Sequence, residues 1–237
     1  MGSFILLMKT KKLITKTFFA TLPVMTGYIV LGMGFGILLK TKGYGVLWAF
    51  VMSICIYAGS MQYLAVSLLT SGASLIAAAI TTFMVNARHL FYGISMIEKY
   101  KGAGKKKPYM IFALTDETYS LVCSEEIADE KERHAYFFMV SLLNQSYWVI
   151  GSALGALLGS VITFSVEGID FALTALFITI FVEQWLGTKC HAPAIIGVAV
   201  SAACVILFGA DNFLIPAMCL ITVAMVIRKK WEDSHHG

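Results

Sequence analysis

Long apolar runs are the feature that most limits what this chain can fold into. They recur through its 237 residues, and a helix needs about 20 mainly apolar residues to cross a bilayer. Of all residues, 58% are hydrophobic and only 14% are charged, whereas a soluble domain carries about 25% charged residues. The runs are rich in Leu, Ile and Val and lack the alternation of a barrel strand. The sequence therefore predicts an all-α, polytopic membrane helix bundle.

The number of crossings depends on one short stretch, residues 109–123. It is apolar on average but shorter than a full span, and it carries Thr115-Asp116-Glu117 at its centre. Without it, seven spans place the amino terminus outside and the lysine-rich segment 98–108 in the cytoplasm, as the positive-inside rule favours. If residues 109–123 do cross the membrane, there are eight spans and the amino terminus lies inside. We expect seven, at residues 18–39, 47–69, 74–97, 135–162, 171–186, 193–208 and 213–227.

The chain is expected to form a single transmembrane domain over residues 1–237. It divides into two repeat-like halves, 18–97 and 135–208, joined by a cytoplasmic connector, 98–134. With seven spans the halves have opposite orientations, which predicts the inverted repeat of a secondary transporter; chance similarity between apolar helices is the alternative. The first span contains Pro23 and several glycines. This composition predicts either a broken first helix that lines a cavity or close helix packing.

An arginine near the end of the third apolar run is the first candidate for a functional residue. Arg88 lies between Asn86 and His89, and an ionisable residue within a membrane segment indicates a functional site by default. The alternative is a side chain that anchors the helix end at the cytoplasmic surface. We expect Asn86 and Arg88 to bind the carboxylate of a small zwitterion. Other expected substrate-binding residues are Tyr57, Gln62 and Gln184, although both glutamines also suit interhelical hydrogen bonds.

Two adjacent acids, Asp116 and Glu117, are expected to couple transport to protons. A carboxylate in apolar surroundings has a raised pKa and can exchange a proton near neutral pH. For Asp116 two structural roles are equally open, as a helix cap or as the partner of Arg88.

Several function classes lack support in the sequence. No phosphate-binding glycine loop, paired metal-ligand motif or positioned catalytic triad is present. We therefore expect no enzyme, cofactor or metal site. The net charge of +4 arises from lysines beside apolar runs, which is typical of topology signals and not of nucleic-acid binding.

The motifs in their order resemble those of the AzlC family of branched-chain amino acid permeases. They are Pro23 with Gly27, Ala58-Gly59-Ser60-Met61-Gln62-Tyr63, Asn86-Ala87-Arg88-His89-Leu90-Phe91-Tyr92-Gly93, Thr115-Asp116-Glu117 and Asp170-Phe171-Ala172-Leu173. The resemblance implies export of leucine, isoleucine or valine across the cytoplasmic membrane of a prokaryote, driven by the proton motive force, with a small AzlD-like membrane subunit as partner. A passive channel, or an assembly subunit that transports nothing, is the alternative.

Overall fold

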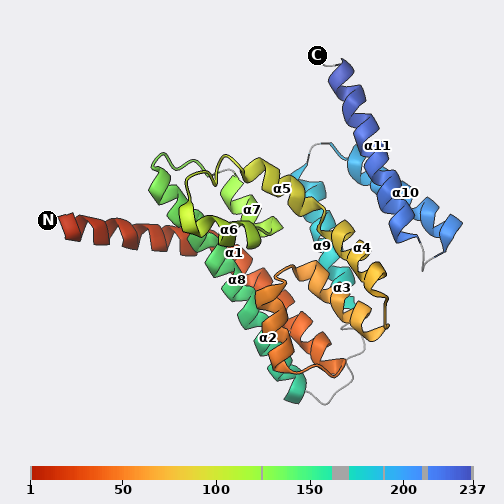
Figure 1. Cartoon of the computed structure of the whole chain (residues 1–237), viewed down its shortest axis with the longest axis horizontal. Coiled ribbons are helices and arrows are strands. Elements are labelled where there is room, and N and C mark those ends of the chain that lie inside the picture. The colour runs from red at the N-terminus through yellow and green to blue at the C-terminus, as the bar shows by residue number, and fades with distance from the viewer. Residues whose placement is uncertain (1, 124, 162–170, 189, 210–212, 236–237) are drawn as a thin grey trace. The chain divides into compact units, whose positions relative to one another are not determined.

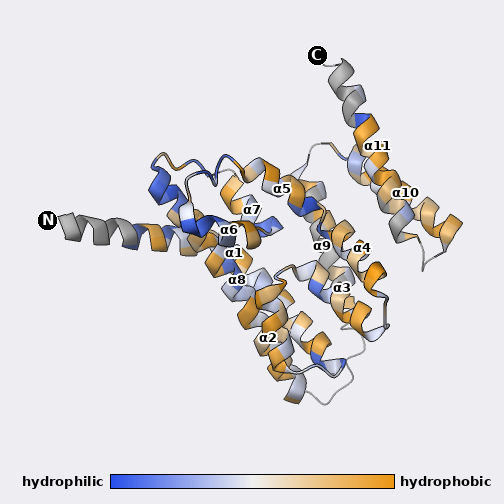
Figure 2. Cartoon of the chain, in the orientation of Figure 1, coloured by the Kyte–Doolittle hydropathy of each residue, from blue (hydrophilic) through white to orange (hydrophobic). Residues whose placement is uncertain are grey.

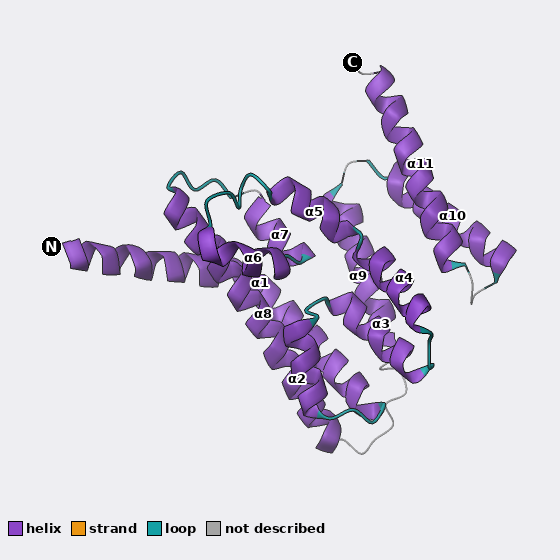
Figure 3. Ribbon diagram, in the orientation of Figure 1, coloured by secondary structure: helices purple, strands orange, loops and turns teal. Residues whose placement is uncertain are grey.

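The structure is a computed structural model that describes residues 2–123, 125–161, 171–188, 190–209 and 213–235. Helices and the turns between them account for this part of the chain (Figure 3), which confirms the predicted all-α class. The elements are α1 (Gly2–Thr41), α2 (Val46–Cys55), α3 (Gly59–Thr70), α4 (Leu75–Asn86), α5 (Arg88–Met96), a 3₁₀ turn (Gly104–Lys106), α6 (Lys107–Phe112), α7 (Asp116–Cys123), α8 (Glu130–Val161), α9 (Phe171–Gly187), α10 (Ala192–Phe208) and α11 (Leu214–His235).

The chain forms two compact units, Met1–Leu176 and Phe177–Gly237. In the second unit α10 packs against α11. The ring of Trp185, near the end of α9, stacks on His191, which precedes α10. The functional residues discussed below belong to the first unit. The repeat-like halves and their connector remain predictions.

Helices α1 and α8 form the framework of the first unit and lie along each other in Figure 1. They run parallel, because Thr21 meets Tyr147 near the middle of both helices (hydroxyls 3.1 Å apart) and Lys40 meets Gly159 near their carboxyl ends. A Cβ atom added at Gly155 would lie 2.1 Å from the carbonyl oxygen of Met33. The glycine ridge of α8 therefore allows a backbone approach that larger residues would prevent.

The prediction of a broken first helix is wrong, because α1 continues through Pro23 as one helix of 40 residues. The placement of the amino terminus opposite the lysine-rich connector is also wrong. Lys16 pairs with Glu125, and Lys99 donates to the carbonyl of Cys123, so both basic regions lie at the same end. The parallel course of α1 and α8 likewise contradicts opposite orientations for the first helices of the two halves. With both basic regions at one end, the positive-inside rule predicts that this end faces the cytoplasm, and we call it the cytoplasmic end.

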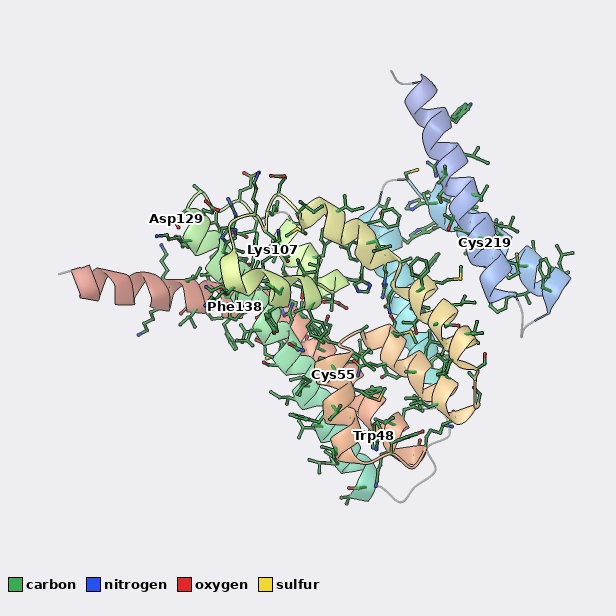
Figure 4. The ribbon with its side chains drawn as sticks, viewed as in Figure 1. Trp48, Cys55, Lys107, Asp129, Phe138 and Cys219 are labelled. Carbon is green, nitrogen blue, oxygen red and sulfur yellow. The ribbon has the colours of Figure 1, made fainter. Side chains whose placement is uncertain are left out.

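The second apolar run is a helical hairpin, α2–α3, and not the predicted single span. Helix α2 begins shortly after Thr41 and reaches the middle of α8, where the Ile54 carbonyl accepts a hydrogen bond from Gln145 (3.2 Å). Helix α3 then runs back, since the Tyr63 hydroxyl donates to the carbonyl of Leu31 (2.7 Å), nearer the Thr41 end of α1. In Figure 4 the course of α2 from Trp48 to Cys55 leads toward the end where Phe138 and Lys107 lie. The hairpin thus enters and leaves at the non-cytoplasmic end.

The stretch 109–123, whose crossing the sequence left open, forms part of a second hairpin, α6–α7. Helix α6 leads inward along α8, where the Tyr109 hydroxyl donates to Gln145 Oε1 (2.7 Å). Helix α7 then leads back. Near its start Thr118 Oγ1 accepts from Asn144 of α8 (3.0 Å), and at its end the carbonyl of Cys123 accepts from Lys99. This hairpin enters from the cytoplasmic end. Its base packs in an apolar cluster made of Met96, Tyr100, Ala103, Met110, Leu114, Val122, Tyr136, Phe137 and Val140.

Among the described residues, two helices are long and apolar enough to cross a membrane, Lys11–Thr41 and Glu130–Val161. A third candidate is the pair α4 and α5, which is bent by 46° at the break between them. The seven-span bundle is therefore not confirmed. Figure 2 shows a large group of hydrophilic residues of the first unit around the segment between α5 and α6 and the start of α8.

Candidate functional site

Three helix breaks meet halfway along the α1–α8 pair. The α2–α3 break contains Tyr57, whose φ of 42° makes it the one non-glycine residue with positive φ among the described residues. The α4–α5 break lies at Ala87, and the α6–α7 break spans 113–115. The rings of Tyr57 and Phe112, from the two hairpins, lie 6.4 Å apart. Broken helices expose backbone groups that lose their helical partners, and such groups are tolerated at membrane depth where they line a cavity.

Arg88, the first residue of α5, links this helix to both hairpins. Its Nη1 atom lies 2.5 Å from Asp116 Oδ2 at the start of α7. Its Nη2 atom donates to Ser60 Oγ at the start of α3 (3.0 Å). A guanidinium keeps its charge at physiological pH and offers several donors in a fixed fork, so a single side chain can hold both hairpin tips.

The first turn of α7 contacts a different helix with each successive residue. Asp116 faces Arg88, as described. Glu117 Oε2 accepts a hydrogen bond from the Tyr28 hydroxyl of α1 (2.6 Å), and this hydroxyl also lies 2.8 Å from Thr115 Oγ1. Thr118 accepts from Asn144 of α8. Successive helical residues project about 100° apart, because a helix has 3.6 residues per turn, so one short motif can bind three neighbours.

Apart from the hydrogen bond between Arg88 and Ser60, the α2–α3 hairpin is held by uncharged contacts. Gln62 is fully buried, its Oε1 atom accepts from the Trp148 indole (2.8 Å), and its Nε2 atom donates to Ser53 Oγ (3.2 Å). The Trp148 ring packs against Tyr28 and Phe35. Both ends of the Gln62 amide are thus engaged, which favours the interhelical role for this residue.

A cavity of about 520 Å³ opens beside the junction. Its volume lies within the roughly 300–1,000 Å³ typical of small-molecule sites. Tyr57 and Asn86 line its polar part, together with His89, and Lys107 places one side of it toward the cytoplasmic end. The remaining lining is largely apolar and comprises Ile56, Ala58, Leu90, Gly93, Ile94, Met96, Ile97, Tyr100, Ile111, Phe112 and Leu114.

Several buried polar atoms at the junction have no hydrogen-bond partner in the structure. They are the Tyr57 hydroxyl, Asn86 Oδ1, Arg88 Nε and Asp116 Oδ1. Leaving such an atom unpaired costs about 1–3 kcal/mol, so native proteins rarely keep several together without a use for them. Their clustering beside a cavity indicates a binding site for a polar ligand.

The structure brings together six of the seven predicted site residues, all in the first unit: Tyr57, Gln62, Asn86, Arg88, Asp116 and Glu117. The side chain of Gln184 lies outside the described part of the chain. Sequence reasoning missed Tyr28, Ser60 and Thr118 as site residues. The signal for Tyr28 was a hydroxyl within an apolar, glycine-rich run, since a buried tyrosine hydroxyl usually has a partner.

Comparison with known proteins adds an independent line of evidence. The sequence profile of a family described as AzlC protein matches residues 23–162, which include all three helix breaks. The chain is 44% identical to a Bacillus subtilis protein named branched-chain amino acid transport protein AzlC, over 90% of this chain and 85% of that protein.

Two more distant relatives are also named as membrane proteins. An uncharacterized membrane protein of Helicobacter pylori strain 26695 is 39% identical over 89% of this chain and 92% of its own length. The Escherichia coli inner membrane protein YgaZ is 25% identical over 90% of both chains. No solved structure matches the chain.

Proposed function

The chain belongs to the AzlC family of membrane transport proteins, and from this premise we propose that it exports branched-chain amino acids across the cytoplasmic membrane of a prokaryote. The substrate class follows the name of the Bacillus subtilis relative. The observation that carries the proposal is the Arg88–Asp116 pair, which lies where three helix breaks meet. Neither residue lines the cavity, but Asn86 and His89, on either side of Arg88 in the chain, do.

A zwitterionic amino acid suits this arrangement of charges. Its carboxylate would bind Arg88 and the free amide groups at the start of α3, because a helix amino terminus favours anions. Tyr57, whose buried hydroxyl has no partner, lies two residues before that helix start in the chain and lines the cavity. The ammonium group would bind Asp116. The substrate thereby inserts between two charges that otherwise neutralise each other.

The aliphatic side chain of the substrate would occupy the apolar part of the cavity. Leu90 and Ile94 of α5 and Ile111 of α6 contribute to this lining. One methylene in an apolar pocket changes discrimination by only about 1–3 kcal/mol. We therefore propose a transporter that accepts leucine, isoleucine and valine as a group.

The two hairpins enter from opposite ends and meet at the junction, which suits alternating access. Movement of α6–α7 would open the cavity toward the cytoplasm, and movement of α2–α3 would open it toward the outside. The proton motive force would drive export, with Asp116 and Glu117 as the coupling acids. A small AzlD-like membrane subunit would complete the transporter.

Efflux from membrane vesicles tests this proposal. Vesicles are prepared from cells that express the chain with and without a small partner subunit, and are loaded with labelled leucine. We expect saturable efflux that needs both subunits, increases with an imposed pH gradient and is lost with Arg88→Ala. Flux that ignores the pH gradient would indicate a channel, and unchanged efflux with Arg88→Ala would indicate an assembly subunit; either result contradicts the proposal.

A further inference from the structure

Two neighbouring carboxylates at the start of α7 have different partners. Asp116 lies against the guanidinium of Arg88. Glu117 forms no ion pair among the described residues, and its Oε2 atom accepts a hydrogen bond from the neutral Tyr28 hydroxyl (2.6 Å). Both acids belong to the same short motif, so the difference arises from the direction in which each side chain leaves the helix.

The cation of the junction, Arg88, pairs with Asp116, and Glu117 has no ion pair of its own in the described part of the chain. The titratable groups that act on it are Tyr28 from α1, Tyr57 from the α2–α3 break, Tyr92 from α5 and Asp116 from its own helix. Three of these are phenols and the fourth is an acid that repels a second negative charge. Glu117 is half-buried, so an ionised carboxylate without a cation beside it carries a desolvation cost, and uptake of a proton removes that cost. Asp116 has no such need, because Arg88 stays positive at any physiological pH.

We propose that Glu117 is the proton carrier of the transporter, with Tyr28 as its positioning residue, and that Asp116 serves the substrate. This inference rests on the proposed transport function and divides the coupling role between the two acids. The junction holds two carboxylates and the guanidinium of Arg88, so a proton on Glu117 and a substrate ammonium would each supply the positive charge that balances the second carboxylate. Proton and substrate therefore compete, as exchange of one for the other requires.

The hydrogen bond between Tyr28 and Glu117 can also couple the protonation state of Glu117 to the position of the α6–α7 hairpin. The hydrogen bond from Tyr28 to Glu117 joins α1 of the framework to the tip of α6–α7. Hydrogen bonds to an ionised acceptor are about twice as strong as those between neutral groups. Protonation of Glu117 weakens this link, while Thr115 remains 2.8 Å from the same hydroxyl. The tip is thus held firmly in the unprotonated state and more loosely in the protonated one.

Leucine exchange and leucine accumulation separate the two roles. Vesicles that carry the chain and its partner subunit are assayed for exchange of labelled against unlabelled leucine at equal pH, and for transport driven by a pH gradient. With Glu117→Gln we expect exchange to persist and the response to the pH gradient to be lost, together with leucine-coupled proton movement reported by a pH-sensitive dye. With Asp116→Asn we expect both assays to fail. Glu98→Gln, which alters an exposed acid of the connector, should leave both unchanged.

The pH profile of transport by Tyr28→Phe is a second measurement, and it should not change if the role of Tyr28 is purely structural. This variant keeps the ring that packs on Trp148 but removes the hydroxyl. Because the hydroxyl stabilises the ionised carboxylate, its loss should move the midpoint of the transport pH profile to higher pH. An unchanged midpoint, or a Glu117→Gln variant that still couples leucine to protons, would overturn the inference. If the wild-type chain moves no leucine in either assay, it is the proposed function that fails.

Discussion

The two hairpins differ in what holds their tips. The α2–α3 hairpin shares the Arg88 contact through Ser60, but its other contacts are neutral. Gln62 accepts from the Trp148 indole of α8 and joins α3 to α2 through Ser53. The α6–α7 hairpin also has neutral contacts to α8, but its tip carries two acids, Asp116 and Glu117, whose contacts depend on charge. Neutral contacts in a buried site respond little to pH or to a zwitterion, whereas charged contacts respond to both. Under the proposed transport function, α6–α7 would be the responsive gate and α2–α3 the more stable one.

Both hairpins pack on the framework of α1 and α8. Their contacts can be compared only if these two helices keep their positions. Gly155→Ala should have the largest effect, because the added Cβ would lie 2.1 Å from the carbonyl oxygen of Met33 and the two helices must separate. We expect a loss of about 3 kcal/mol in unfolding free energy, at the upper end for overpacking. Thermal unfolding of the purified protein in detergent measures it.

Gly27→Ala is the matched control, since a Cβ atom there meets nothing within 4 Å. Alanine favours a helix over glycine by about 1 kcal/mol, so this variant should be as stable as the wild type or more so. Equal melting temperatures for the two variants would mean that the framework can yield, and the contrast between the hairpins would lose its basis.

Arg88→Ala tests the charged side of the comparison. It leaves Asp116 without its cation and releases Ser60. Loss of one partner of a buried charge pair costs about 2–5 kcal/mol; both side chains here are partly exposed, which places the cost near the lower limit. We expect leucine exchange to fall by about thirtyfold, the equivalent of about 2 kcal/mol.

Arg88→Lys keeps the charge but cannot reproduce the fork that reaches both hairpins. Its exchange rate should therefore fall between those of the wild type and Arg88→Ala. A lysine variant as inactive as the alanine variant would show that the fork matters more than the charge, and full activity would show the reverse.

Gln62→Leu tests the neutral side. Leucine fills a similar volume but leaves the Trp148 indole and the Ser53 hydroxyl without a partner. An unpaired buried group costs about 1–3 kcal/mol, so we expect a lower melting temperature with an unchanged ratio of protons to leucine. A changed ratio at an unchanged melting temperature would assign Gln62 to the transport cycle and remove the distinction between the hairpins.

Tyr57→Phe should have the smallest effect. The Tyr57 hydroxyl is buried and has no partner, so its removal should leave the melting temperature unchanged or raise it. If the hydroxyl faces the substrate carboxylate, the KM for leucine should increase several-fold while the maximal rate changes little. Initial-rate measurements over a range of leucine concentrations would detect this, and an unaltered KM would exclude the contact.

The sequence was sufficient for much of the helix content and for the chemistry of the junction. The end of α8 and the bounds of α10 agree with the predicted spans to within about two residues, the usual precision of helix ends. The contact between Arg88 and Asp116 was one of the alternatives weighed, and the structure contains it. Ionisable residues in apolar runs are conspicuous because burying them is costly, so they can be found without a structure.

Chain direction was harder to predict, for a physical reason. Residues 47–69 have the length and hydropathy of one crossing, yet the chain reverses at Tyr57, where no proline marks the turn. Hydropathy measures affinity for lipid and is the same for a crossing and for a hairpin. If this run is counted as a crossing, all segments that precede it are assigned to the wrong side of the membrane. That error placed the basic amino terminus outside, whereas Lys16 lies beside Glu125 at the connector end.

The central claim is that the cavity beside the Arg88–Asp116 pair is the substrate site. The most direct test places a single cysteine at Ala58, which lines the cavity, in a variant without the five native cysteines that still transports leucine. The rate of maleimide labelling is measured with and without leucine. We predict that leucine slows labelling, and that Arg88→Ala abolishes this protection. A labelling rate that leucine does not change, in a variant that still transports it, would contradict the account.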